Sequence, residues 1–167
     1  MLGDSRTTLW ELFGEMQLEG FGSVGRGTYN HAWSGGPLTI LSQYFAGIAP
    51  TKPAFREFAV RPQMGDLKQI ETVVPTQFGE IRLNMSRSDE QPFQIHLVVP
   101  EGTSASVGVP KQYVSTHSDI AINGEVIWKN GSSVKSDFSG ASAREGDPHI
   151  IFSVPSGEWS FSVSANN

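Results

Sequence analysis

The first 33 residues of this 167-residue chain contain a carboxylate, a histidine and two tryptophans that could do chemistry together. Glu11 directly follows Trp10, and Asn30-His31 precedes Trp33 after a stretch rich in glycine. A carboxylate can serve as a general base, amide and imidazole groups can hydrogen-bond to hydroxyls, and indole rings offer flat apolar faces to a sugar ring. These residue types predict a sugar-binding wall that carries one catalytic carboxylate.

The stretch between the two groups is a glycine-rich loop, with glycines at positions 20, 22, 25, 27, 35 and 36. Each glycine adds chain entropy that folding must overcome, and a long loop in a compact domain is usually either functional or disordered. The aromatic residues and the histidine among the glycines argue against disorder. No Lys-Ser or Lys-Thr pair follows the glycines, so a phosphate-binding loop is not indicated.

Each of these residues also has a simpler interpretation. A single glutamate in a short helix is usually a solvated surface residue, and this alternative applies to Glu11. His31 can order its loop by bonding to the backbone, and Trp10 and Trp33 can belong to a core rather than to a substrate platform.

Composition narrows the class of protein. A net charge of −5 leaves no basic surface for nucleic acid, and no apolar run is long enough to span a bilayer. With no cysteine and no ligand spacing among the histidines and acidic residues, we expect neither a disulfide nor a metal site, and no cofactor. The first residues lack the pattern of a signal peptide.

The apolar pattern changes from helical to alternating near residue 50. A short helix is expected after Thr7-Thr8, and a longer one over 36–47, opened by Pro37 and carrying apolar residues three and four positions apart. Beyond Pro53 the period becomes two, and Asn123-Gly124 is a strong hairpin signal. The predicted strands cover 55–61, 81–85, 95–99, 106–109, 120–122, 126–128, 150–154 and 159–163.

The sequence therefore predicts a mostly β fold: an antiparallel β-sandwich over 53–167, preceded by a short helical segment over 1–50. Residues 129–147 are polar and small, and we expect a flexible loop there. The sandwich is long enough to bury its own core. The helical segment is not, which favours its being cut from a larger helical domain.

This organisation resembles the C-terminal end of bacterial α-L-rhamnosidases, glycoside hydrolase family 78. The resemblance rests on Thr-Thr-Leu-Trp-Glu at 7–11, Asn30-His31, and the helix leading to Gly-Ile-Ala-Pro at 47–50. It continues through Phe-Arg-Glu-Phe at 55–58, Arg-Pro at 61–62 and Thr-Gln-Phe-Gly at 76–79, and extends from Thr7 to about Pro110.

The resemblance implies that residues 1–50 are the last helices and active-site loop of an (α/α)6 catalytic barrel, followed by the C-terminal sandwich over 53–167. The implied reaction is inverting hydrolysis of terminal α-L-rhamnosyl groups, with Glu11 as general base and His31 in contact with the sugar. The general acid would lie upstream, in a part of the barrel that this chain lacks, so the chain alone is expected to be inactive. The implied location is periplasmic or extracellular.

Two alternatives stay open. One is a non-catalytic carbohydrate-binding or structural β-sandwich with a helical appendage. Sugar binding there is not favoured, because we expect few exposed aromatics beyond Tyr113, Trp128 and Trp159. The other is a related helical-barrel glycosidase that prefers a different sugar. Rhamnose-containing glycosides and the missing barrel are the partners expected under the first hypothesis.

Overall fold

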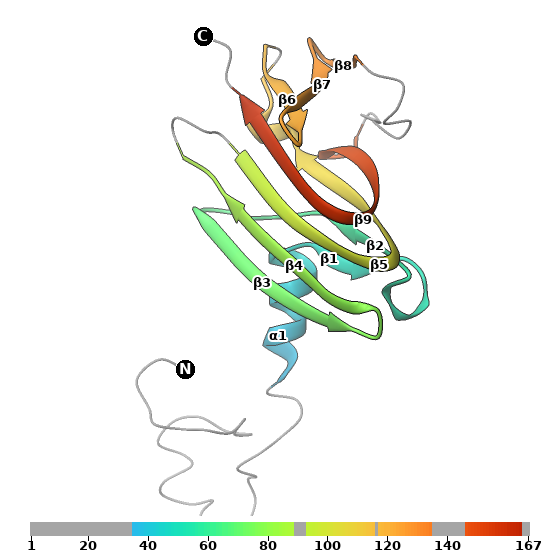
Figure 1. Ribbon diagram of the computed structural model, residues 1–167. Helices are drawn as coiled ribbons and strands as arrows, with labels where there is room; N and C mark the ends of the chain where they lie inside the picture. Colours follow the sequence, from blue (N-terminus) through green and yellow to red (C-terminus); the bar gives the residue numbers. More distant parts are fainter. Residues whose placement is uncertain (1–34, 89–92, 116, 135–145, 165–167) are drawn as a thin grey trace, which may run out of the picture. The chain divides into compact units, whose positions relative to one another are not determined.

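The computed structural model describes residues 35–88, 93–115, 117–134 and 146–164 (Figure 1). The chain divides into two compact units, residues 1–41 and residues 42–167. The first unit contributes α1, Gly36–Ile40, with Pro37 in its first turn as predicted, and a π-helical turn, Leu41–Phe45, follows in the chain. The predicted helix is therefore shorter than 36–47, and Ile48 belongs to a strand instead.

The second unit is built from strands, and those among the described residues join into one mixed sheet of nine strands. Hydrogen bonds link them in the order β1-β2-β5-β9-β6-β7-β8, with β4 paired to β5 and β3 paired to β4. The mostly β fold is confirmed. The strands are β1 Ile48–Pro50, β2 Glu57–Val60, β3 Gln69–Thr76, β4 Gly79–Ser86, β5 Phe93–Pro110, β6 Asp119–Ile122, β7 Glu125–Lys129, β8 Ser132–Ser133 and β9 His149–Ser164.

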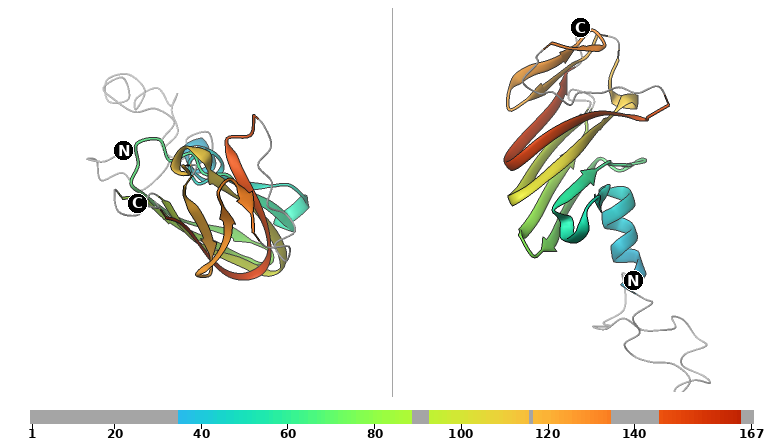
Figure 2. Two further views of the ribbon diagram at one scale, coloured as in Figure 1. Left: turned by 90° about the horizontal axis from the view of Figure 1, so that it is seen from above. Right: turned by 90° about the vertical axis from the view of Figure 1, so that its right-hand side faces the viewer.

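Two long antiparallel strands, β5 and β9, run side by side through this sheet (Figure 1). The first half of β5 pairs with β4 and with the second half of β9, whereas the second half of β5 pairs with β2 and with the first half of β9. The register shifts between Val99 and Ser104, which marks an irregularity where the strand can bend. The two halves thus belong to the two layers of a sandwich, and Figure 2 shows the same strands from two further sides.

Alternation of buried and exposed residues, clearest in β4 and in the first half of β5, places one face of each layer in a shared core. In β4 the buried residues are Ile81, Leu83 and Met85, while Arg82 and Asn84 lie on the other face. Burying one such side chain contributes roughly 1.5–3 kcal/mol. The largest fully buried side chains come from both layers and include Phe58, Phe93, Phe152 and Phe161.

The two strand pairs at the β1 edge differ in direction. β1 pairs with β2 antiparallel, but β2 pairs with β5 parallel, so the expectation of a purely antiparallel sandwich was wrong at this one pair. The β1–β2 pair also draws residues 48–50, which we expected in the helical part, into the sheet.

The structure joins several strands that the sequence pattern separates. The predicted strands 95–99 and 106–109 are two halves of β5, and 150–154 and 159–163 are two halves of β9. The Asn123-Gly124 hairpin turn is confirmed, with positive φ at both residues. Among the three sandwich aromatics, Trp128 is buried rather than exposed.

Two elements were not predicted. β3 was missed, and none of its residues is fully buried, so its pattern is weak. The expected loop over 129–147 begins with a second hairpin, because Asn130-Gly131 also has positive φ at both residues and connects β7 to β8. Residues 135–145 of that segment lie outside the described residues.

Gly47 is the position where the β1 edge tolerates no side chain. Its φ is +73°, and a Cβ built there would lie 2.1 Å from the carbonyl carbon of Arg61. The Arg61 N–H also donates to the Gly47 carbonyl at 2.9 Å. Any side chain at Gly47 would therefore separate the two backbones and break this bond.

Gly131 provides a matched control for a substitution at Gly47, because its φ is +76° but nothing lies within 4 Å of an added Cβ. We expect Gly131→Ala to cost only about 1–2 kcal/mol of backbone strain. Gly47→Ala should cost more than about 3 kcal/mol, since the clash adds to the strain. Urea denaturation of both variants measures this, and equal losses would contradict the role given to Gly47.

Candidate functional site

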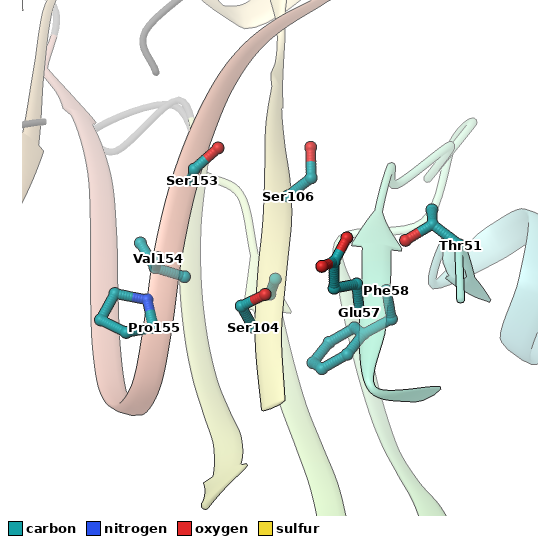
Figure 3. Close-up of a pocket in the computed structure, with 9 residues that line it drawn as sticks. Thr51, Glu57, Phe58, Ser104, Ser106, Ser153, Val154 and Pro155 are labelled. Atoms are coloured by element: carbon teal, nitrogen blue, oxygen red, sulfur yellow. The ribbon is translucent and has the colours of Figure 1, made fainter. Parts of the chain in front are cut away.

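The predicted catalytic and sugar-binding residues, Glu11, His31, Trp10, Asn30 and Trp33, lie outside the described residues. Their roles therefore stay predictions. The described residues instead show a depression of about 320 Å³ beside β2, β5 and β9 (Figure 3). Its lining is Thr51, Glu57, Phe58, Ser104, Ala105, Ser106, Ser153, Val154 and Pro155.

Strand register explains why polar groups gather in this depression. Glu57 pairs with Ser104, which pairs with Pro155. Two residues further along β2, Ala59 pairs with Ser106, and Ser106 pairs with Ser153. The alternate residues of these strands, Phe58, Ala105 and Val154, are buried in the core, so the polar rows lie on the outer face of this layer.

Glu57 supplies the charge of the depression. Its Oε1 accepts a hydrogen bond from Lys52 Nζ at 2.5 Å, and both side chains are about half exposed. Figure 3 shows the Glu57 carboxylate between Thr51 on one side and Ser104 and Ser106 on the other. A carboxylate among hydroxyls is an arrangement that accepts hydrogen bonds from a polar ligand.

A strained turn, Pro53–Phe55, leads into β2 next to the depression. Ala54 and Phe55 have φ of 59° and 62°, in the left-handed region that non-glycine residues rarely occupy. Both backbone N–H groups of Thr51 and Lys52 donate to the Glu57 carbonyl, at 2.9 and 3.0 Å, and close the turn. The turn therefore fixes where Glu57 begins its strand.

The strain at Ala54 gives a direct prediction. Ala54→Gly removes the Cβ that makes φ of 59° costly, and we expect a gain of about 1 kcal/mol, or a melting temperature a few degrees higher. Thermal unfolding followed by circular dichroism measures it. A lower melting temperature would show that the strain at Ala54 is smaller than the entropy that glycine adds to the unfolded chain.

A second polar cluster joins the start of β9 to the end of β2. Arg61 Nη1 donates to Asp147 Oδ2 at 3.1 Å, and the backbone N–H of His149 donates to Asp147 Oδ1 at 2.9 Å. His149 is buried, and its Nε2 donates to the Pro62 carbonyl at 3.1 Å. The His149 backbone N–H lowers the pKa of Asp147, desolvation partly opposes this, and Arg61 lowers the pKa further.

The lowered pKa makes this cluster sensitive to acid. Because the folded chain favours ionised Asp147, the carboxylate stabilises the fold above its unfolded pKa of about 3.9, and this contribution is lost as the pH falls through the lower folded value. We expect Asp147→Asn to lower the melting temperature at pH 7 by the few degrees that a charge-assisted hydrogen bond supplies.

The difference between Asp147→Asn and the unmodified chain should shrink as the pH is lowered toward 3. Glu80→Gln is a suitable control, because Glu80 forms only an exposed ion pair with Arg82, and such pairs contribute little. Melting curves across this pH range test the prediction. A difference that stays constant with pH would contradict it.

Within the described ranges, no group of three or more histidine or acidic residues could hold a metal ion. No helix in this part of the chain is long and apolar enough to cross a membrane. His96 is exposed on its strand, as predicted.

Sequence reasoning missed the depression as a site. The sequence analysis gave Glu57 only as part of the Phe-Arg-Glu-Phe motif and of a predicted strand. It placed Ser106 and Ser153 in predicted strands and gave Ser104 no role. The available signal was the alternation of small polar residues with Ala105 and Val107 along one strand. That alternation predicts a shared face but not which other strands lie beside it.

Comparison with known proteins connects this fold to one family. Residues 47–119 match the model of the bacterial alpha-L-rhamnosidase C-terminal domain. No curated protein sequence matches the chain.

Two solved structures have a similar fold. The alpha-L-rhamnosidase from Dictyoglumus thermophilum aligns with a TM-score of 0.73 and 23% identity over 96% of this chain and 16% of that one. The alpha-L-rhamnosidase from Streptomyces avermitilis, solved with L-rhamnose, aligns with a TM-score of 0.62 and 20% identity over 83% of this chain and 12% of that one. The chain thus spans less than a fifth of either protein. The predicted resemblance to the C-terminal part of a bacterial α-L-rhamnosidase is confirmed by the match of residues 47–119 to the C-terminal domain model of that family.

Proposed function

We propose that this chain acts as the C-terminal part of an inverting α-L-rhamnosidase, which removes terminal α-L-rhamnosyl groups from glycosides or plant polysaccharides. The observation that carries the proposal is the match of residues 47–119 to the rhamnosidase C-terminal domain. The two similar folds, both described as alpha-L-rhamnosidases, support it.

In this proposal residues 1–50 are the last helices and active-site loop of the catalytic (α/α)6 barrel. The exposed apolar side chains after Gly36 support this assignment: Ile40, Leu41 and Tyr44 are 52%, 52% and 59% exposed. No residue of α1 or of the π-helical turn is buried. A set of exposed apolar residues usually marks an interface, here with further helices of the same enzyme.

Inverting hydrolysis needs one protonated carboxyl group on the leaving-group oxygen and one carboxylate that activates water on the opposite face of the sugar. Glu11 is proposed as the second of these, the general base. Asn30 and His31 would bond the sugar hydroxyls, while Trp10 and Trp33 would contact the ring and its methyl group. The general acid would come from upstream barrel helices, so the 167 residues alone would not turn over substrate.

Replacing Glu11 in the complete enzyme tests the proposed base. With the upstream barrel present, an aryl α-L-rhamnoside should be hydrolysed, with the β anomer of rhamnose as the first product by NMR. Glu11→Gln removes the group that takes the proton from water, and we expect kcat to fall by about 10²–10⁴-fold.

Glu19→Gln is the matched control, since Glu19 is an acidic residue of the same segment with no proposed role, and its kcat should stay within about twofold of the unmodified enzyme. Substantial activity in the Glu11 variant would remove Glu11 from the mechanism. An inactive complete enzyme that nevertheless binds glycans would favour the non-catalytic carbohydrate-binding alternative, and cleavage of another glycoside in place of the rhamnoside would favour the related-glycosidase alternative.

A further inference from the structure

The depression beside β2, β5 and β9 holds more hydrogen-bonding groups than the fold uses. Four hydroxyls line it, those of Thr51, Ser104, Ser106 and Ser153. Within the part of the chain that the structure describes, no hydrogen bond engages any of these side-chain hydroxyls. Each can therefore donate and accept toward a ligand.

The charge of the depression favours a neutral ligand. Lys52 binds one carboxylate oxygen of Glu57, and the second oxygen, Oε2, has no partner among the described residues. An anion would be repelled by the carboxylate, and a metal ion would find only this one carboxylate among the lining residues. A neutral polyol matches both the carboxylate and the hydroxyls of the lining. Its own hydroxyls can donate hydrogen bonds to Glu57 and accept them from serine and threonine.

Size and shape point to a single sugar ring. The volume of about 320 Å³ lies at the lower end for small-molecule sites. Pro155 adds a rigid apolar surface at the edge opposite Thr51, as Figure 3 shows. A pyranose ring combines the two properties that this lining requires, a polar rim of hydroxyls and apolar C–H faces.

The site is also held rigid before any ligand binds. Ser104, Ser106 and Ser153 lie on paired strands, and Glu57 follows the strained turn Pro53–Phe55. Residues in such strained conformations persist only where the surrounding structure enforces them, and they concentrate at functional sites. Groups fixed in advance lose little entropy when they bind a ligand.

We propose that this depression is a binding site for one neutral pyranose unit, with the Glu57 carboxylate as the central acceptor and the hydroxyls of Thr51, Ser104 and Ser106 around it. The site uses none of the residues assigned to hydrolysis. It would hold a glycan on the β-sandwich, apart from any cleavage of that glycan, and it does not depend on the proposed rhamnosidase activity.

An NMR titration of the 167-residue chain tests this site. L-Rhamnose, D-galactose and D-glucose are added separately to ¹⁵N-labelled chain, up to about 50 mM. At least one sugar should shift the amide signals of Glu57, Ser104, Ser106 and Ser153, with a Kd on the order of 1–10 mM, as expected for a small polar ligand on an open site.

Two variants and one control locate the binding. Glu57→Gln and Ser106→Ala should each raise Kd at least fivefold, and Ser106→Ala leaves the Lys52–Glu57 pair in place if the first variant loses stability. His96→Ala is the control, because His96 lines another polar depression, of about 280 Å³ on the outer face of β4, β5 and β9, which has no carboxylate. Its Kd should not change.

The outcomes separate clearly. Shifts from none of the three sugars would overturn the proposal, as would a Kd that neither Glu57→Gln nor Ser106→Ala alters, or shifts confined to the His96 depression. Sugar binding that both variants weaken supports the site even if the complete enzyme proves inactive on rhamnosides, so the result is independent of the proposed function.

Discussion

Strands β5 and β9 pair on both sides of a bend, and this pairing determines the rest of the sandwich. β5 contributes Phe93–Val99 to one layer and Ser104–Pro110 to the other, and β9 follows it with the opposite direction. Both strands cross from one layer to the other, so the backbone itself and the hydrogen bonds between β5 and β9 join the two layers. The layers cannot separate without breaking backbone hydrogen bonds as well as exposing the core, so burial and pairing stabilise the same arrangement.

The depression beside β2, β5 and β9 depends on the same bend. Its floor is the second half of β5 together with the first half of β9, and β2 joins them through its parallel pairing with β5, which runs from Glu57–Ser104 to Val60–Val107. The backbone N–H of Ser104 also donates to the Arg56 carbonyl at 3.2 Å, just beyond the end of β2. The strained turn before β2 and the register shift within β5 thus meet at the point where Glu57 faces its hydroxyls.

The sequence pattern predicted single strands well and their connections poorly. Alternation located Ile81–Met85 and Ile95–Val99, because one face of each is buried and the other is not. It could not show that the strands around Pro100 and around Pro155 continue, since proline and glycine at a bend look the same as at a turn. Likewise Asn123-Gly124 lies between two short apolar runs and predicts a hairpin, while the same dipeptide at 130–131 is followed by two serines and gives no such signal.

The candidate site was harder to predict than the fold for a physical reason. Glu57, Ser104 and Ser153 are far apart in the sequence. They come together because β2 pairs with β5 in parallel and β5 pairs with β9. No local pattern encodes such a pairing. A site of this kind becomes visible only when the register is known, whereas a motif such as Trp10-Glu11 is contiguous and can be recognised directly.

The two ends of the family match lie at identifiable points of the fold. The match begins at Gly47, where the backbone must approach Arg61, and ends at Asp119, where β6 starts. β9 lies beyond it, although β9 pairs with β5 along nearly its entire length. Pairing demands only backbone groups and alternating apolar residues, which many sequences supply, while the close approach at Gly47 admits glycine alone. The strands outside the match are joined to it through β9, because β6 pairs with β9 and β9 pairs with β5, which lies within the match.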